Sequence, residues 1–549
     1  MEKSRCPDKT VNSARPMLSN GKKVLIDGQQ RITALMAAIA GQEVLDEDFN
    51  RDRIKIAFNP LASDDSKRFA VQDASHLKDK RWIPDISVVF RPEFDPFDFS
   101  IRYCESNDGI TPNEVNRALN DLKGIANRQI GVIELNHTLD IDEVTEIFIR
   151  INSKGTPLSQ SDFVMSKMAA DMEHGGNLMR KAVDYFCHLA VKPEFYTQLT
   201  HDSEFQQSKY ASKIQWLSKD YEDIYDPDYG DMLRVSFMHQ FHRGKLADLV
   251  SLLSGRDFKT KEFREDIVAD SYQKLDQGLL NFMNHYNFDQ FVLAIKGAGF
   301  CSSKLLNSAM TMDFAYTLYL LLLNDPAIPN DQIKRYVQKW FVLSTLTSRY
   351  IGSPESQMDR DMRSMEEKGF LAFLEEVEAS ALSDNFWFVT LPQNLETSAV
   401  NSPVFNVFLA AQIRLNANSL LMHGTKVSDL IAISGDIHHI FPRAYLKKNG
   451  VDSKTKYNQV ANYIYLDTQI NKAISDSAPC DYFKRAFQQC ESKVPSFGNI
   501  TDTTALNLNL EENCIPPTIV EMDASCYDAF LAERRKLMAA MIKRYYKSL

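Results

Sequence analysis

The feature that most constrains this chain is a central segment that is apolar on nearly every side. Residues 309–323 read AMTMDFAYTLYLLLL. A helix without a polar face has to be enclosed by other helices, because none of its sides is suited to water. A second long helix is expected over residues 330–349. We therefore predict a helical bundle over residues 201–425 that acts as a scaffold between two other domains.

The N-terminal part of the chain mixes strand and helix signals. Short apolar or alternating runs predict strands at 24–26, 54–58 and 131–135. A helix is expected at 144–151, where apolar residues recur at helical spacing after an aspartate that can cap it. Residues 1–200 are therefore predicted to form an α/β domain.

The C-terminal part, residues 426–549, changes character again. Strands are expected at 436–442 and 462–466, the first ended by a proline and the second rich in aromatic and branched residues. Asp467 can cap a short helix directly after the second strand, and a long helix is expected at 527–546. Because its strands are confined to the two end domains, the chain is predicted to be α+β and mostly helical.

Composition excludes several classes of protein. No run of residues reaches the roughly 18–20 apolar positions of a membrane span, so no membrane association is expected. Eight cysteines occur without a C-x-x-C pair, which disfavours zinc–thiolate sites and a disulfide scaffold and favours a reducing cytoplasm. The net charge of −10 taken alone disfavours nucleic acid as a partner.

Adjacent histidines lie in the first predicted strand of the C-terminal part. Neighbouring side chains of a strand point to opposite faces, so His438 and His439 can serve different purposes. One imidazole can bind a metal while the other faces a water molecule. The alternative is a pair of surface or half-buried histidines without a chemical role.

The residues around this pair narrow the choice. The order D-x-H-H-x-x-P at 436–442, Asn462 at the start of the second strand and Asn471 in the following helix resembles the HNH, or ββα-metal, nucleases. The resemblance implies that His439 is the general base, that His438 and Asn471 bind a divalent ion such as Mg²⁺ or Mn²⁺, and that Asn462 ties the hairpin and orients the base. Asp436 is a further candidate ligand. Many HNH sites have a histidine where Asn471 stands.

A second motif lies near the N-terminus, in residues 24–35 (VLIDGQQRITAL). It predicts a strand, a glycine turn and a helix whose first turn carries two amide side chains and Arg31. Free backbone amides at a helix N-terminus together with a guanidinium suit a phosphate group. The plainer interpretation is a strand-to-helix turn with a solvated arginine.

The same motif resembles the signature of the ParB-like domain of GmrSD-type modification-dependent (type IV) restriction enzymes. Other segments that resemble this family are FIRINSKGTPL at 148–158, WFVLSTLTSRY at 340–350 and FLAERRKLM at 530–538. The resemblance touches all three predicted domains in the family's order, with the HNH domain last. Family members usually carry a longer segment before the DGQQR motif. Either the start of the chain is placed too late, or the chain is a truncated member.

In this family the ParB-like domain binds and hydrolyses a nucleoside triphosphate, GTP or ATP, and regulates the nuclease. The resemblance implies that the nucleotide site is formed by Asp27, Gly28, Gln29, Gln30 and Arg31. Asn152 and Arg150 are weaker candidates from the second motif, and Asn152 can equally be a cap for its loop. The implied function is an NTP-regulated, metal-dependent endonuclease that cuts modified phage DNA.

Basic residues of the last predicted helix are candidate DNA contacts. Arg534, Arg535 and Lys543, with Lys536, Arg544 and Lys547 nearby, are expected to form a basic surface beside the nuclease motif. Lysines 447, 448, 454 and 456, between the two predicted strands, are further candidates. A solvated helix face would explain the same residues without DNA.

Two functional alternatives and the state of assembly stay open. The chain can be a nucleotide-regulated DNA-binding or toxin-type protein with weak or no nuclease activity, which Asn471 and the short N-terminus favour. It can also be an HNH enzyme that cuts RNA. A homo-oligomer is compatible with the sequence.

Overall fold

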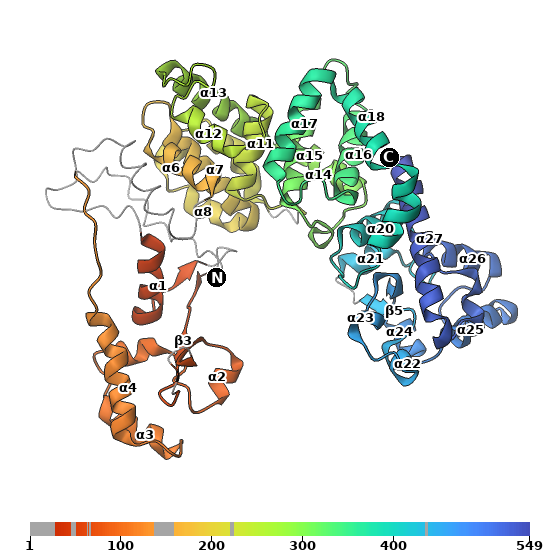
Figure 1. Cartoon of the computed structure of the whole chain (residues 1–549), viewed down its shortest axis with the longest axis horizontal. Coiled ribbons are helices and arrows are strands. Elements are labelled where there is room, and N and C mark those ends of the chain that lie inside the picture. The colour runs from red at the N-terminus through yellow and green to blue at the C-terminus, as the bar shows by residue number, and fades with distance from the viewer. Residues whose placement is uncertain are drawn as a thin grey trace. The chain divides into compact units, whose positions relative to one another are not determined.

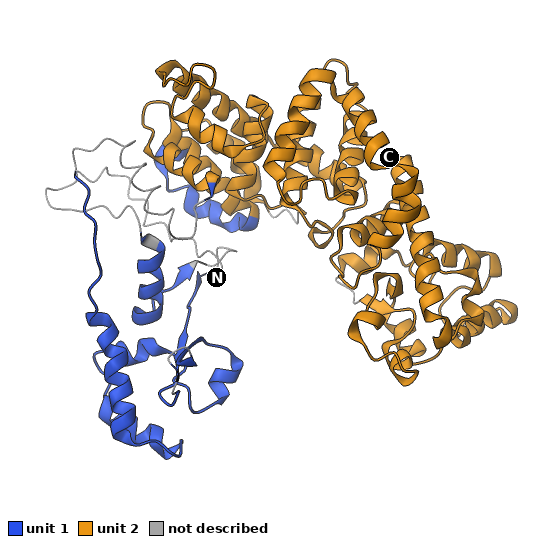
Figure 2. Ribbon diagram, viewed as in Figure 1, with its two compact units in different colours: residues 1–159, 191–207 blue, residues 160–190, 208–549 orange. Residues whose placement is uncertain are grey.

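The computed structural model of the chain describes residues 28–45, 51–62, 64, 67–136, 159–219, 224–433 and 437–549. These residues fall in two compact units (Figure 2). Unit 1 contains residues 1–159 and 191–207, and unit 2 contains residues 160–190 and 208–549. Helices predominate in both units, and the strands are two or three residues long.

Unit 1 combines helices with two small antiparallel hairpins. Strand β1 pairs with β2 and strand β3 pairs with β4, the second pair in the register Ile56↔Val71 and Phe58↔Phe69. In chain order, its elements are α1 (Gln29–Ala40), β1 (Val44–Leu45), β2 (Arg51–Asp52), β3 (Ile56–Phe58), β4 (Phe69–Val71), α2 (Ala74–Lys78), η2 (Ile86–Phe90), α3 (Pro96–Glu105), α4 (Pro112–Gly124), η3 (Ile125–Asn127), η4 (Pro193–Phe195), α8 (Tyr196–Leu199) and α9 (Ser203–Gln206).

The core of unit 1 forms where β3 meets η2, α3 and α4. Phe58 exchanges backbone hydrogen bonds with Ile83, at 2.9 and 2.7 Å, and Val89, Val115 and Leu119 pack around them. The strand predicted at 54–58 is thus present as β3. The strand predicted at 131–135 is wrong, because these residues do not form a strand, no described residue pairs with them, and Val132 and Ile133 are exposed. The strand predicted at 24–26 and the helix predicted at 144–151 lie outside the described residues.

Unit 2 is almost entirely helical (Figure 1). Its elements, in chain order, are α6 (Gln160–Ala170), α7 (Gly176–Val191), α10 (Ala211–Ile214), η5 (Gln215–Ser218), α11 (Tyr229–Phe241), α12 (Leu246–Leu253), α13 (Glu265–Phe282), α14 (His285–Gly297), η6 (Ser303–Leu305), α15 (Ala309–Leu322), α16 (Ile333–Leu346), α17 (Pro354–Lys368), α18 (Phe370–Ala381), the π-helix η7 (Phe386–Thr390), α19 (Leu391–Asn394), α20 (Pro403–Arg414), α21 (Val427–Ala432), β5 (Ile437–His439), α22 (Arg443–Lys448), α23 (Lys454–Tyr457), η8 (Val460–Asn462), β6 (Tyr463–Tyr465), α24 (Thr468–Ile474), α25 (Pro479–Ser492), α26 (Thr503–Glu512), η9 (Pro517–Glu521), η10 (Ala524–Cys526) and α27 (Tyr527–Ser548).

Helix α15 is the apolar segment expected to be enclosed, and the structure confirms this prediction. It packs against α11 on one side and α16 on another, and nearly all of its residues from Thr311 to Leu322 are buried. Ser308 caps its first turn by accepting the backbone N–H of Thr311 at 3.2 Å. The helix expected at 330–349 is α16, slightly shorter at both ends.

One charged side chain of α15 is enclosed as well. Asp313 lies 2.5 Å from the guanidinium of Arg234 on α11 and accepts the hydroxyl of Tyr225 at 3.3 Å. Asp231, one turn before Arg234, lies 3.5 Å from the same guanidinium. Burial raises the pKa of Asp231, and the negative charge of Asp313 raises it further. Burial also raises the pKa of Asp313, to about 6, although the positive charge and hydrogen bond of Arg234 oppose this shift.

The units divide the chain differently from the three expected domains. Residues 160–190 lie within the range predicted for the N-terminal domain, 1–200, but belong to unit 2, where α6 packs against α12 and α11. Residues 426–549 form one compact unit with the helical region before them. Among the described residues, no helix is both long and apolar enough to cross a lipid bilayer.

Candidate functional site

The two strands expected around the histidine pair are present and form a hairpin. Strand β5 pairs antiparallel with β6, so that His438 lies opposite Ile464 and His439 opposite Tyr463. Helix α24 begins two residues after β6, and Asp467 caps it by accepting the backbone N–H of Gln469 at 2.8 Å. The order strand, strand, helix therefore occurs at the predicted residues. Figure 1 shows β5 with α22, α23 and α24 in the C-terminal part of unit 2.

His439 is half-buried and held from two sides. Its Nε2 lies 2.9 Å from the side-chain oxygen of Asn458, and the ring of Tyr463 meets it edge-to-face at 5.3 Å. Burial lowers the pKa of His439, and positive Arg443 adds to this, while the bond to Asn458 opposes it. A lowered pKa keeps the imidazole neutral at physiological pH. A neutral imidazole is the form that can accept a proton.

The bond to Asn458 also selects one nitrogen of the ring. The amide oxygen of Asn458 accepts, so Nε2 carries the hydrogen and Nδ1 keeps its lone pair. Asn458 belongs to none of the motifs predicted from the sequence. It is the residue directly after α23, and the only signal it offers is an amide shortly before the predicted Asn462.

Asn462 joins the two sides of the hairpin and is completely buried. Its side-chain oxygen accepts the backbone N–H of Phe441 at 2.8 Å, while its amide donates to the carbonyls of Phe441 at 3.1 Å and Tyr457 at 3.2 Å. Its own carbonyl accepts the backbone N–H of Ile440 at 2.9 Å. Asn462 thus connects the first residues after β5 with the residues just before β6.

The structure brings His438, His439 and Asn462 into one hairpin, with Asn471 on the helix that follows it. His438 is half-buried on the strand, and Asn471 is half-buried in the middle of α24. The remaining candidate ligand, Asp436, lies outside the described residues. Imidazole nitrogen and amide oxygen are both neutral donors that divalent ions accept.

The structure corrects the predicted role of Arg534. This side chain is completely buried, and its guanidinium donates to the carbonyls of Ala461 at 2.9 Å, Tyr463 at 2.8 Å and Asn513 at 3.2 Å. Burial lowers its pKa to about 10, which leaves it charged at neutral pH. Arg534 therefore fastens the hairpin to α27, and because its guanidinium is completely buried it exposes no donor to a DNA phosphate.

The other two predicted DNA contacts on α27 are largely covered. Arg535 lies 3.6 Å from Glu396, and its side chain is 15% exposed. Lys543 lies 3.2 Å from Asp384 and 4.2 Å from the centre of the Phe388 ring. The expected basic surface on α27 is reduced to Lys536, Arg544 and Lys547, of which Arg544 is paired with Glu511 at 3.3 Å.

Exposed basic side chains instead collect on the segment between the two strands of the hairpin. Arg443, Lys447 and Lys448 lie on α22, and Lys454 and Lys456 on α23, all exposed. Lys448 is paired with Asp476, and Lys447 lies over the ring of Tyr457 at 5.4 Å. This is the same segment that ends in Asn458, the partner of His439.

The DGQQR motif is described from Gly28 onward. Gly28 has φ 88°, a left-handed conformation that favours glycine, and its carbonyl accepts the backbone N–H of Ile32 at 2.9 Å as α1 begins. A Cβ placed on Gly28 would lie 3.8 Å from the guanidinium of Arg31, so this side chain folds back toward the start of the helix. Gln29 is the first helical residue, and Gln30 and Arg31 are exposed. Asp27, Arg150 and Asn152 lie outside the described residues.

Comparison with known proteins bears on the N-terminal part of the chain. Residues 11–169 match the family model of the GmrSD restriction endonuclease N-terminal domain. The match includes the DGQQR motif and ends within α6, before the β5–β6 hairpin. No curated protein and no solved structure matches the chain. Over residues 11–169 this protein is thus similar to the N-terminal domain of GmrSD restriction endonucleases.

Proposed function

We propose that this chain is a metal-dependent HNH endonuclease of the GmrSD type that hydrolyses phosphodiester bonds of modified phage DNA. The observation that carries the proposal is the environment of His439, a half-buried imidazole whose Nε2 lies 2.9 Å from the side-chain oxygen of Asn458 and whose pKa is lowered by burial. His439 belongs to a strand–strand–helix segment that follows, along the chain, a region similar to the N-terminal domain of GmrSD restriction endonucleases. Such an enzyme acts in the cytoplasm, where phage DNA arrives.

His439 supplies the base of the reaction. Its Nδ1 accepts a proton from water, the water oxygen bonds to phosphorus, and the bond from phosphorus to the leaving sugar oxygen breaks. Asn458 keeps the ring in the tautomer that this step needs. Asn462 holds the backbone on both sides of the base.

His438 and Asn471 are the candidates to hold a divalent ion such as Mg²⁺ or Mn²⁺. They offer one imidazole nitrogen and one amide oxygen, which leaves most coordination positions to water and phosphate oxygens. A bound ion supplies positive charge for the phosphate and the leaving oxygen. Lys454 and Lys456, exposed on α23, would position the DNA backbone.

A cleavage assay with matched histidine variants tests the proposal. The purified chain should cut DNA carrying modified bases in the presence of Mg²⁺ or Mn²⁺, and His439→Ala should not. His423→Ala is the control, because this histidine is exposed and belongs to another loop of unit 2. Equal cleavage by His439→Ala would contradict the assignment, and RNA offered in parallel distinguishes the two nucleic acids.

Regulation by GTP or ATP forms the second part of the proposal. The start of α1, with Gly28 and the guanidinium of Arg31 turned toward it, supports a triphosphate site there. Arg31→Ala should lose nucleotide binding, while Arg117→Ala, an exposed arginine on α4, should keep it. Unchanged binding by Arg31→Ala would contradict a site at the DGQQR motif.

A further inference from the structure

A short loop between α6 and α7 holds one histidine in a fixed orientation. Asp171 accepts the backbone N–H groups of His174 at 3.0 Å and Gly176 at 2.8 Å through one carboxylate oxygen. Its other oxygen lies 2.8 Å from Nδ1 of His174. A Cβ on Gly176 would come within 2.7 Å of the Met168 carbonyl, so only glycine allows this loop to close so tightly.

The ring of His174 is also fixed by α13. It stacks on Tyr272, with the ring centres 5.3 Å apart and the planes 9° from parallel. Its Nε2 lies 3.8 Å from the carboxylate of Glu265, at the start of α13. The two contacts turn Nδ1 toward the loop and Nε2 toward Glu265.

A third potential ligand completes the group. Glu173, His174 and Glu265 each offer one ligand atom, and these atoms lie within 4.8 Å of one another. Both glutamates are exposed, so they can move the short distance needed to bind a common ion. All residues of this group and of the loop that supports it belong to unit 2.

The arrangement has the chemistry of a transition-metal site. Imidazole with carboxylates suits borderline divalent ions such as Zn²⁺. A histidine that binds a metal through one nitrogen commonly donates its other N–H to a carboxylate, and Asp171 occupies that position at Nδ1. This bond directs the lone pair of Nε2 toward the two glutamates.

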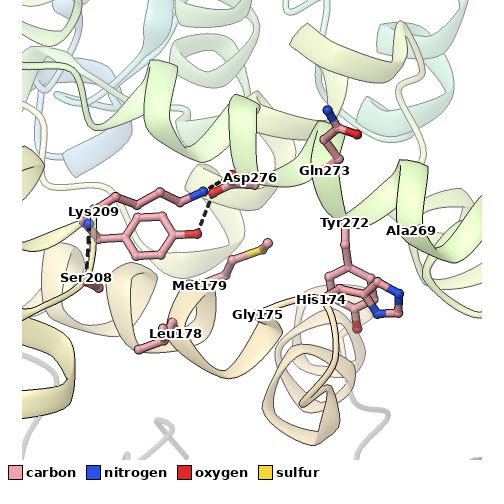
Figure 3. A pocket seen from close by; sticks show the side chains of 11 residues that line it. His174, Gly175, Leu178, Met179, Ser208, Lys209, Ala269, Tyr272, Gln273 and Asp276 are labelled. Carbon is pink, nitrogen blue, oxygen red and sulfur yellow. Dashed lines mark hydrogen bonds and ion pairs between the residues drawn. The ribbon is translucent and has the colours of Figure 1, made fainter.

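The space beside His174 leaves room for further ligands. His174 and Tyr272 line one end of a cavity of about 510 Å³, and Lys209 and Asp276 form an ion pair at the other end (Figure 3). Three protein ligands leave coordination positions that water can fill from this side.

We propose that Glu173, His174 and Glu265 bind a divalent transition-metal ion that clips the α6–α7 loop to the start of α13. This site is separate from the hairpin that carries His438 and His439, and it does not depend on nuclease activity. It lies beyond residues 11–169, which match the restriction endonuclease domain.

Equilibrium dialysis of the full chain against Zn²⁺ tests the proposal. The parent for this experiment is His438→Ala, which removes the candidate metal ligand of the hairpin. It should bind one equivalent of Zn²⁺ with a Kd of about 10 µM or lower. His174→Gln should remove this equivalent, and Asp171→Asn should weaken it by about 10–100-fold. Glu173→Gln and Glu265→Gln, both at exposed positions, should weaken it without unfolding the chain.

His285→Gln is the matched control. This histidine also stacks on an aromatic ring, that of Trp216 at 4.6 Å, and lies 3.0 Å from one carboxylate, Asp289. It is not part of a group of three ligands among the described residues, so its replacement should leave the Zn²⁺ equivalent in place. Equal binding by His174→Gln and its parent, or no bound equivalent in the parent, would overturn the proposal.

Discussion

Asn462 holds Phe441 from both sides of its backbone, accepting its N–H at 2.8 Å and donating to its carbonyl at 3.1 Å. The pair spans the segment from the end of β5 to the start of β6. Because Asn462 is completely buried, water cannot replace these bonds when the side chain is shortened.

Asn462→Ala should therefore destabilise the hairpin by about 2–4 kcal/mol, as buried backbone groups lose their partners. Hydrogen exchange of the amides in residues 437–465 measures the effect locally. Asn499 provides the control, because it holds both backbone groups of His423 in the same way but at an exposed position. Asn499→Ala should cost less than about 1 kcal/mol, and equal costs for the two variants would contradict the argument from burial.

The contact between Asn458 and His439 can be tested through the pH dependence of cleavage. In Asn458→Asp, a carboxylate beside the ring favours the protonated imidazole and raises the pKa of His439. Since the base must be neutral, the acid limb of the kcat/KM profile should move to higher pH by about one to two units. Asn458→Ala should lower the rate without this upward shift. Asn449→Asp, an exposed change of the same charge, should leave the profile in place.

The buried guanidinium of Arg534 should matter for stability more than for DNA binding. Arg534→Met leaves three carbonyls without their donor and should cost about 2–4 kcal/mol in the unfolding of unit 2. Arg544→Met removes an exposed arginine of the same helix and should cost less than about 1 kcal/mol. Chemical denaturation compares the two, and a fully stable Arg534→Met would contradict the structural role.

The exposed lysines of α23 should contribute to DNA affinity through phosphate contacts. Lys454→Gln and Lys456→Gln should each weaken binding and lower the slope of log affinity against log salt by about 1. Lys536→Gln and Lys547→Gln make the same charge change on α27 and should have smaller effects. Titration of labelled DNA at several salt concentrations distinguishes the two surfaces. If the α27 variants weakened binding more than the α23 variants, the DNA contact would lie on α27, as first predicted.

The buried carboxyl groups around Arg234 predict a dependence of stability on pH. Burial raises the pKa of Asp231, so this group stays protonated in the folded chain at a pH where it ionises in the unfolded one. Its contribution to stability is therefore present below about pH 4 and is lost as the pH rises toward the raised pKa. Thermal unfolding between about pH 5 and 8 should show this decline. Asp231→Asn should flatten it, whereas Asp270→Asn, at an exposed position on α13, should not.

The helices and strands that could be predicted are those whose own consecutive residues determine their structure. Helix α15 was expected because an apolar surface on every side can be read from consecutive residues, and its burial follows directly. Strands β5 and β6 were expected from their branched and aromatic residues and from the proline after the first. The segment at 131–135 has the same kind of local pattern, but no described strand pairs with it.

The parts of the site that could not be predicted depend on distant partners. Arg534 lies at helical spacing between the apolar Phe530 and Met538, which indicates burial, but its acceptors belong to other segments of the chain and cannot be identified from this spacing. Asn458 reaches His439 across the segment between the two strands. His174 and Glu265 meet only because α6, α7 and α13 pack in one unit.

The three acceptors of Arg534 are all main-chain oxygens, so these hydrogen bonds do not depend on which side chains the acceptor residues carry. Outward-facing residues of the hairpin can be exchanged, by evolution or by an engineer, while the same guanidinium continues to seat the backbone in the same place. The exposed side chains of the hairpin can therefore change without changing the hydrogen bonds that hold its backbone to Arg534.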